Sequence, residues 1–155
     1  MYCAAAGVRR VALATVGAPR MGRSMSETPG RSSPFTEAVG VEMEAMEAGR
    51  ARATLVVSEN HFNSGGIVHG GVLMTLADCV AGAAAHSLLD KGQRAVTTDA
   101  HLTCLRSVTR GELNAEAEVV HAGRRLLHAR LSLSCNEQLI ASGVYTFMRI
   151  EHKGA

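Results

Sequence analysis

The sequence predicts a single domain of the α+β class, in which one long apolar helix packs against a run of antiparallel strands. Three observations favour this class: an apolar segment of helix length at residues 70–89, alternating apolar and polar stretches after it, and short turn-forming breaks between those stretches. A helix that is separated in sequence from hairpin strands packs on one face of a single sheet. At 155 residues the chain is long enough for one domain with a real core.

The strands are expected on both sides of the helix in the sequence. "VEMEAM" (41–46) and "RATLVV" (52–57) flank "EAGR" (47–50), which is typical of a hairpin. Residues 96–104 alternate with period two, as half-buried strands do. Two further alternating strands and a last strand at 139–150 follow, separated by "HAGR" and "NEQ". The side chains expected to point inward from the two middle strands are Leu113, Ala115, Ala117, Val119, Leu127, Ala129, Leu131 and Leu133.

The apolar segment is expected to be a buried helix of a water-exposed domain. Asp78 is the only formally charged residue from Gly70 to Leu89. A bilayer span needs about 20 apolar residues, and a carboxylate near its centre would cost about 2.5–3.5 kcal/mol. The flanks also lack the aromatic and basic anchors of a membrane interface. We therefore expect "VLMTLADCVAGAAAHSLL" (72–89) to lie inside a curved sheet, apolar all round.

Composition and charge narrow the class of protein. Apolar residues make up 46% and charged residues 19%, as in ordinary globular domains, and the net charge of +2 does not point to nucleic acid or an acidic membrane as a partner. The four cysteines form no Cys-x-x-Cys pair, and the seven histidines do not stand at zinc spacings from them. This pattern predicts reduced thiols in a cytoplasmic protein without a metal site.

The first 25 residues are rich in Ala, Arg, Gly and Ser and contain no acidic residue. Such a segment is a disordered tail, a stretch upstream of a true start at Met25, or a mitochondrial presequence. The folded domain is expected within residues 26–155.

A motif at the start of the apolar segment resembles a known family. Asn63, His69-Gly70-Gly71 and Thr75-Leu76-Ala77-Asp78, with "AVTTDAHLTCLRSVTRGELNAEAEVVHAGRR" (95–125), are similar to the hotdog-fold acyl-CoA thioesterases of the phenylacetate-catabolism (PaaI-like) type. The likeness covers about residues 35–150. It implies a curved antiparallel sheet around one central helix, which agrees with the element order above. It also implies hydrolysis of acyl-CoA to free acid and coenzyme A without a cofactor, in a homodimer that often pairs into a homotetramer.

The chemistry of the motif suits thioester hydrolysis. Unpaired N–H groups at a helix start attract negative charge, and glycine lets a carbonyl approach the backbone closely. The resemblance gives Gly70 the oxyanion role, helped by His69 and Asn63, and makes Asp78 the nucleophile or the general base. The sequence leaves both roles of Asp78 open. Thr97 matches the position where relatives hold the attacking water. The candidates for binding coenzyme A, whose phosphates suit the forked donors of arginine, are Gly71, Arg106, Ser107, Arg124 and Arg125.

The spacing of Gly70 and Asp78 predicts an assembly. Eight residues of helix separate them by about 12 Å, whereas a reacting atom must lie about 3 Å from both the oxyanion donor and the base. One helix therefore cannot serve both ends of one thioester. Two antiparallel copies could, so we expect two sites shared across a homodimer, as the family builds them.

Two other functions suit the same fold, because hotdog domains also serve as dehydratases and as ligand-binding modules. A dehydratase or hydratase would place a His and a carboxylate at the acyl β-carbon, in place of an oxyanion turn. A non-catalytic acyl-CoA-binding module would have no reason to keep Asp78 together with Asn63 and His69. The joint pattern therefore favours a hydrolase.

Overall fold

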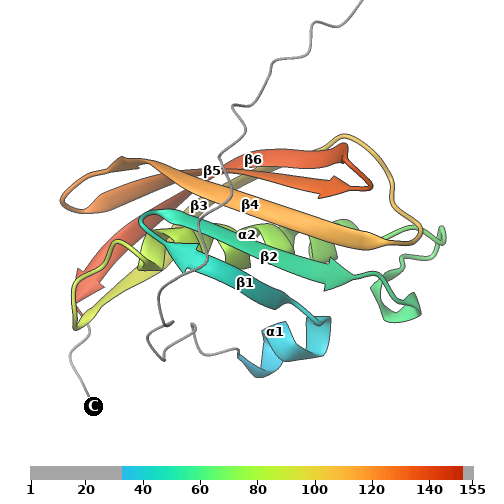
Figure 1. The fold of residues 1–155 in the computed structure, drawn as a ribbon, viewed down its shortest axis with the longest axis horizontal. Helices are drawn as coiled ribbons and strands as arrows, with labels where there is room; N and C mark the ends of the chain where they lie inside the picture. The colour runs from blue at the N-terminus through green and yellow to red at the C-terminus, as the bar shows by residue number, and fades with distance from the viewer. Residues whose placement is uncertain (1–32, 152–155) are drawn as a thin grey trace, which may run out of the picture.

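A computed structural model describes residues 33–151 and confirms the α+β class. The segment 1–25, for which the sequence predicts a tail or presequence, lies outside the described residues. Figure 1 shows the arrangement of the elements, which in chain order are α1 (Pro34–Val39), β1 (Glu42–Glu47), β2 (Arg50–Val56), the 3-10 turn η1 (Glu59–His61), α2 (Gly70–His86), β3 (Gln93–Cys104), β4 (Glu112–Ala122), β5 (Leu126–Cys135) and β6 (Gln138–Glu151).

The strands form one six-stranded sheet in the order β1-β2-β4-β5-β6-β3, and every pairing is antiparallel. Two hairpin turns contain consecutive residues with positive φ, Ala48-Gly49 (50° and 79°) and Asn136-Glu137 (49° and 63°). Turns of this kind match the right-handed twist of the strands that they join. Because α2 carries the chain across the sheet, β3 is placed at the far edge, beside β6 alone.

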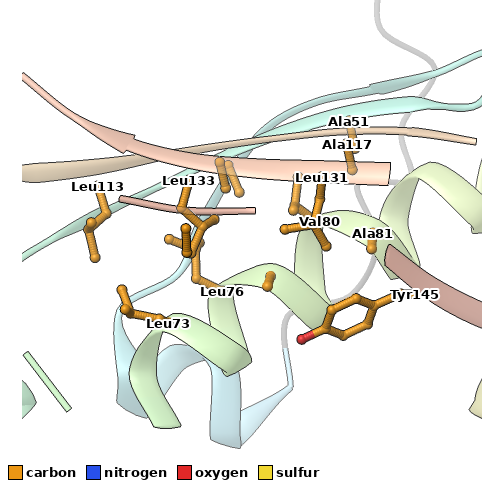
Figure 2. Packing of buried hydrophobic residues seen from close by; sticks show 14 of the residues in the cluster. Ala51, Leu73, Leu76, Val80, Ala81, Leu113, Ala117, Leu131, Leu133 and Tyr145 are labelled. Carbon is orange, nitrogen blue, oxygen red and sulfur yellow. The ribbon is translucent and has the colours of Figure 1, made fainter. Parts of the chain in front are cut away.

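The core lies between α2 and the concave face of the sheet. Leu76, Val80 and Ala81 of the helix lie among side chains from β2, β4, β5 and β6, as Figure 2 shows for part of the cluster. The inward side chains predicted for residues 113–133 are all buried except Val119, which is half-buried, so both alternations are confirmed. Each fully buried large apolar side chain contributes about 1.5–3 kcal/mol to stability.

One side of α2 remains uncovered in the single chain. The helix runs from Gly70 to His86, and its core-facing side chains are nearly inaccessible. Along the opposite side, exposed or half-buried residues form an open stripe: Gly71, Met74, Thr75, Asp78, Cys79, Gly82, Ala83 and His86. The prediction of a helix buried all round was therefore wrong for one chain, because the sheet curves around only part of the helix.

Strand β3 also departs from the predicted alternation. Its register against β6 shifts between Thr97 and Asp99, so that Thr97 stands opposite Phe147 and Ala100 opposite Tyr145. Phe147 and Tyr145 are core residues, so Thr97 and Ala100 share the helix side of the sheet. Such a bulge adds one residue to a strand and reverses the alternation beyond it. The regular period of 96–104 did not reveal this.

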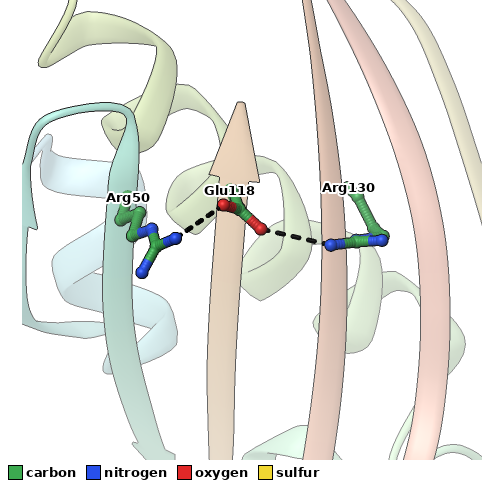
Figure 3. A network of polar contacts seen from close by, with 3 residues as sticks. All are labelled: Arg50, Glu118 and Arg130. Carbon is green, nitrogen blue, oxygen red and sulfur yellow. Dashed lines mark hydrogen bonds and ion pairs between the residues drawn. The ribbon is translucent and has the colours of Figure 1, made fainter. Parts of the chain in front are cut away.

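The outer face of the sheet carries a small ion-pair network (Figure 3). Glu118 of β4 accepts hydrogen bonds from Arg50 of β2 at 2.8 Å and from Arg130 of β5 at 3.1 Å. The hydrogen bond from Arg50 is the main reason why the pKa of Glu118 is lowered. Since the three side chains are 39–60% exposed, each of the two ion pairs contributes at most about 1 kcal/mol.

Two short elements were not predicted, α1 and η1. Ser33 caps α1 by accepting a hydrogen bond from the Thr36 N–H, and Pro34 occupies its first turn. Gly40, with φ of 77°, ends it. Within residues 33–151, no helix has the length and apolar character that crossing a membrane requires.

Candidate active site

The start of α2 is held by His69. The His69 Nδ1 accepts a hydrogen bond from the Gly71 N–H at 2.9 Å, and the His69 N–H donates to the His61 carbonyl at 2.8 Å. The Gly71 N–H is thus already engaged. The Gly70 N–H has no acceptor among the described residues, and a Cβ on Gly70 would meet nothing within 4 Å. Of the two glycines, Gly70 is the one with a donor and space for a ligand.

Asn63 shapes the loop that leads to His69. Its Oδ1 accepts the N–H of Gly65 at 2.8 Å and that of Ile67 at 3.4 Å. An Asn side chain that binds the backbone two residues ahead forms an Asx turn. The contact that the structure shows for Asn63 is therefore one that orders the loop.

Asp78 and Thr97, both predicted as site residues, lie in direct contact. The Thr97 Oγ1 donates a hydrogen bond to the Asp78 Oδ1 at 2.9 Å, joining the open side of α2 to the edge strand β3. Asp78 is half-buried and Thr97 is exposed. The carboxylate is thus fixed in orientation through one oxygen and lies on the uncovered side of the helix.

The charge of Asp78 affects two neighbouring groups. Burial, with Asp78 as the second cause, raises the pKa of the Cys79 thiol to about 11. The same two causes, in the same order, and a smaller contribution from Cys104 raise the pKa of the Tyr145 hydroxyl to about 12. Both groups are protonated at neutral pH, so Cys79 does not supply a thiolate nucleophile there.

Two shallow hollows flank Thr75 on the open side of α2. The first, here the His69 hollow, has a volume of about 440 Å³ and is lined by Phe35, Val39, Asn60, His61, Phe62, His69, Gly71, Val72 and Thr75. The second, the Asp78 hollow, has a volume of about 320 Å³ and is lined by Phe35, Thr36, Met74, Thr75, Asp78, Cys79, Ala100 and Tyr145. The helix start and the carboxylate therefore line different hollows of one chain.

Sequence reasoning missed several of these lining residues, because it did not predict α1 and η1. His61 is buried and joins the two elements: its Nδ1 accepts the Ser58 N–H at 3.1 Å, and its Nε2 lies 3.0 Å from the Val39 carbonyl. Since Nδ1 is the acceptor, Nε2 carries the proton and donates. The one sequence signal for α1 was the Ser33-Pro34 pair, which is typical of a helix start.

The four candidates for binding phosphate lie in two separate places. Arg106 follows β3, with Ser107 beside it, and donates to the Leu139 carbonyl at 2.6 Å. Arg124 and Arg125 are exposed in the β4–β5 turn, where the Arg125 carbonyl accepts the Arg149 N–H. Residues 139 and 149 are at opposite ends of β6, about 33 Å apart at 3.3 Å per residue. One chain therefore does not bring the two pairs to a single phosphate.

The cysteines of the described region are all free thiols: Cys79, Cys104 and Cys135. Cys3 lies outside that region. Between residues 33 and 151, no three His, Cys, Asp or Glu side chains are grouped so that they could hold a metal ion.

Comparison with known proteins identifies the fold and the family. Residues 65–141 match the family model described as the thioesterase superfamily. A conserved protein of Pseudomonas aeruginosa, PA5202, is 32% identical with a TM-score of 0.76, over 79% of this chain and 100% of its own. A variant of the phenylacetic acid degradation protein PaaI from Thermus thermophilus is 27% identical with a TM-score of 0.71, over 76% of this chain and 100% of its own. The proofreading thioesterase EntH of Klebsiella pneumoniae is 29% identical over 56% of this chain and 64% of its own.

A six-stranded antiparallel sheet over one long helix, with the His-Gly-Gly turn at the helix start, defines a hotdog-fold protein. The chain belongs to the thioesterase superfamily. The predicted resemblance to PaaI-like thioesterases is confirmed. Family membership supports thioester hydrolysis as the general activity.

Proposed function

We propose that this protein hydrolyses acyl-CoA thioesters to a free acid and coenzyme A. The observation that carries the proposal is the Asp78–Thr97 pair on the open side of α2, with the Gly70 N–H, which has no acceptor within residues 33–151, at the start of the same helix. A carboxylate and a separate oxyanion donor are the two groups that thioester hydrolysis needs. Relatives whose names include thioesterase also support the proposal.

In this mechanism the thioester carbonyl oxygen accepts a hydrogen bond from the Gly70 N–H, where the dipole of α2 favours the developing negative charge. In one route, Asp78 takes a proton from water while the water oxygen bonds to the carbonyl carbon. The tetrahedral intermediate then expels the coenzyme A thiolate, which receives that proton. Thr97 holds the carboxylate through its hydroxyl proton, and its oxygen can still accept a hydrogen bond from the attacking water.

In the other route, an oxygen of Asp78 attacks the carbonyl carbon and displaces the thiolate, which forms a mixed anhydride. Water then hydrolyses that anhydride and restores the carboxylate. Both routes have the same balance, since one thioester and one water give one acid and one thiol. Asp78 is therefore the central residue of either.

The active unit in this proposal is a homodimer that carries two sites, each with Gly70 from one chain and Asp78 of the partner subunit. The 12 Å spacing along α2 is the first reason, estimated at about 1.5 Å per residue. The separate His69 and Asp78 hollows are the second. The third is β3, a long edge strand whose only neighbour in the sheet of residues 33–151 is β6, and which two-fold pairing would cover. Two dimers would then pair into a homotetramer in the cytoplasm.

Coenzyme A would be bound by exposed arginines near each site, without a further cofactor. Because Arg106 and Ser107 lie far from Arg124 and Arg125 in one chain, the two pairs would meet one coenzyme only from different subunits, or serve different parts of it. Gly71 has no side chain, so it would let the coenzyme approach the backbone closely. Its N–H would not bind the coenzyme, because that group already donates to His69.

The test is free-thiol release from a panel of acetyl-, butyryl-, hexanoyl-, octanoyl- and phenylacetyl-CoA, with the protein first dialysed against a chelator. Turnover of at least one member that survives chelation is expected. Absorbance at the enoyl band of crotonyl-CoA is followed in parallel, because its loss without thiol release would mark a hydratase. Binding of the panel with neither signal would mark a non-catalytic module. Either result would overturn the proposal.

A further inference from the structure

The His69 hollow and the Asp78 hollow have one side chain outside α2 in common. Phe35, on α1, lines both, and the only other shared residue is Thr75 of the helix itself. Figure 1 shows α1 below β1, and α1 contacts α2. Two of the three phenylalanines of the chain, Phe35 and Phe62, line the His69 hollow. The aromatic side chains are thus concentrated at the proposed site.

Phe35 is exposed, yet its helix is held firmly. The ring side chain is 63% accessible, one of the largest exposures among the apolar residues described. A hydrogen bond at each end fixes α1: Ser33 accepts from the Thr36 N–H, and the buried His61 donates to the Val39 carbonyl. A single exposed apolar residue is ordinary on a protein surface. Phe35 differs because it lies on a fixed element and lines both hollows, so its ring is placed to contact whatever occupies them.

The chemistry of the two hollows indicates what they accept. The His69 hollow is walled by Phe35, Val39, Phe62 and Val72, and the Asp78 hollow by Phe35, Met74 and Ala100. Neither is lined by Lys or Arg, and the one carboxylate is Asp78. Such walls favour an uncharged apolar group, whereas an acyl group that ends in a carboxylate would meet a like charge without a compensating cation.

We infer that Phe35 is a specificity-determining residue, whose ring limits the size of the uncharged apolar acyl group that the site admits. This rests on the proposed function. In a shared-site dimer, each ring would line the oxyanion end of one site and the carboxylate end of the other. Phe35 would therefore act on both sites of the dimer through its size, without taking part in proton transfer.

The experiment compares kcat/KM for straight-chain acyl-CoA from acetyl to dodecanoyl, and for glutaryl-CoA, in the wild type, Phe35→Ala and Phe35→Trp. Phe35→Ala should raise the ratio of kcat/KM for long over short chains at least about tenfold, since each methylene in an apolar pocket changes discrimination by about 10–200-fold. Phe35→Trp should lower that ratio. Glutaryl-CoA should be a poor substrate for all three. A ratio that stays within about twofold of the wild type in both variants would overturn the inference.

Matched variants separate this effect from a general loss of structure. Val56→Ala truncates a side chain of β2 that is 65% exposed and lines neither hollow, so it should not change the ratio. Met74→Ala and Phe62→Leu each alter one hollow only, and show which of the two receives the distal part of the chain. A shift of the same size with Val56→Ala would contradict a local role of Phe35.

A binding measurement keeps this inference separate from the proposed hydrolysis. Non-hydrolysable thioether analogues of butyryl- and decanoyl-CoA are titrated into the wild type and Phe35→Ala by calorimetry. If the wild type releases no thiol but the ratio of the two Kd values shifts at least about tenfold, the proposed activity fails and the role of Phe35 stands. If thiol is released and neither ratio changes, the activity stands and the role of Phe35 fails.

Discussion

Asp78 is held in a fixed orientation and is still open to a ligand, because Thr97 engages one of its oxygens and the residue lies on the open side of α2. The sequence singled it out as the one charge in a long apolar segment, and the resemblance matched Thr97 to the position that holds the attacking water. The structure brings these two side chains within 2.9 Å across α2 and β3. What the sequence could not give was the exposure of Asp78, because a single helix pattern does not reveal how far a sheet curves around it.

Asp78→Asn should keep the fold and lower kcat by at least about a hundredfold, the lower end of what a positioned acid or base contributes. The amide is nearly isosteric and can still accept the Thr97 hydrogen bond, but it neither takes a proton at neutral pH nor acts as a nucleophile. Steady-state thiol release and a thermal melt measure the two effects. Asp90→Asn, at an exposed Asp just beyond α2, is the control and should change neither. Full turnover in Asp78→Asn with a lowered Tm would mean that Asp78 is structural.

Phe35 lines both hollows, and the sequence did not predict it as a site residue. The sequence predicted His69, Gly70 and Asp78 at the start of or within one helix, and the structure has them there, whereas Asn63 lies in the loop before it. Their catalytic roles stay predictions. Phe35 reaches the same place from α1, a helix of only six residues. Helices of that length are not stable alone and depend on tertiary contacts, here the hydrogen bond from His61 to Val39. Local sequence could not supply that contact.

At the scale of elements, the period of two correctly predicted the strands that pair with a neighbouring strand on each edge. The alternation at 113–119 and 127–133 is confirmed because β4 and β5 are paired on both edges and buried on one face. The alternation at 96–104 failed because β3 has one neighbour and contains a bulge. A bulge changes which face a side chain occupies without altering residue composition. The period of the sequence therefore does not reveal it.

The contact between β3 and β6 gives a stability prediction. A Cβ built on Gly143 of β6 would collide with the backbone carbonyl of His101. Backbone cannot move aside as a flexible side chain can, so Gly143→Ala should lower the free energy of unfolding by more than about 2 kcal/mol, within the range for overpacked sites. Urea denaturation followed by circular dichroism measures this as a lower midpoint. Ser142→Ala, at the adjacent position of the same strand, should shift the midpoint far less; equal shifts would contradict the collision.

For the whole molecule, the proposed dimer would use each α2 twice, with Gly70 in one site and Asp78 in the other. A single chain has Gly70 and Asp78 on one helix. Asp78 lines one hollow, and His69 and Gly71, the neighbours of Gly70, line the other. No sequence pattern could show the partner surface, because pairing depends on the assembled open side of α2 and the edge of β3. The spacing along the helix predicts a partner subunit, and that stays a prediction.

Co-refolding Asp78→Asn with Gly70→Leu should restore activity that each variant lacks alone. The Leu side chain has room at position 70, so that variant should fold while it blocks the approach to the N–H. In a mixed dimer, one site carries both changes and the other carries neither. Random pairing makes half of the dimers mixed, so recovery of up to about a quarter of wild-type activity is expected for a two-fold dimer.

The control for this experiment mixes Asp78→Asn with Asp78→Ala, two changes at one position, which should restore nothing. Native mass spectrometry confirms that mixed dimers form. Mixed dimers without activity, or a wild-type monomer that is fully active at high dilution, would contradict sites shared between chains.

The environment of Cys79 also determines how readily its thiol is oxidised. Peroxide reacts with thiolates far faster than with thiols. With a pKa of about 11, only about one Cys79 in ten thousand is a thiolate at pH 7. The Cys79 thiol is therefore protected first by its burial and second by the neighbouring Asp78 charge, whereas Cys104 is exposed on β3. Peptide mass spectrometry after mild peroxide treatment should find sulfenic and higher acids at Cys104 well before Cys79, with thiol release from acyl-CoA still intact at that stage.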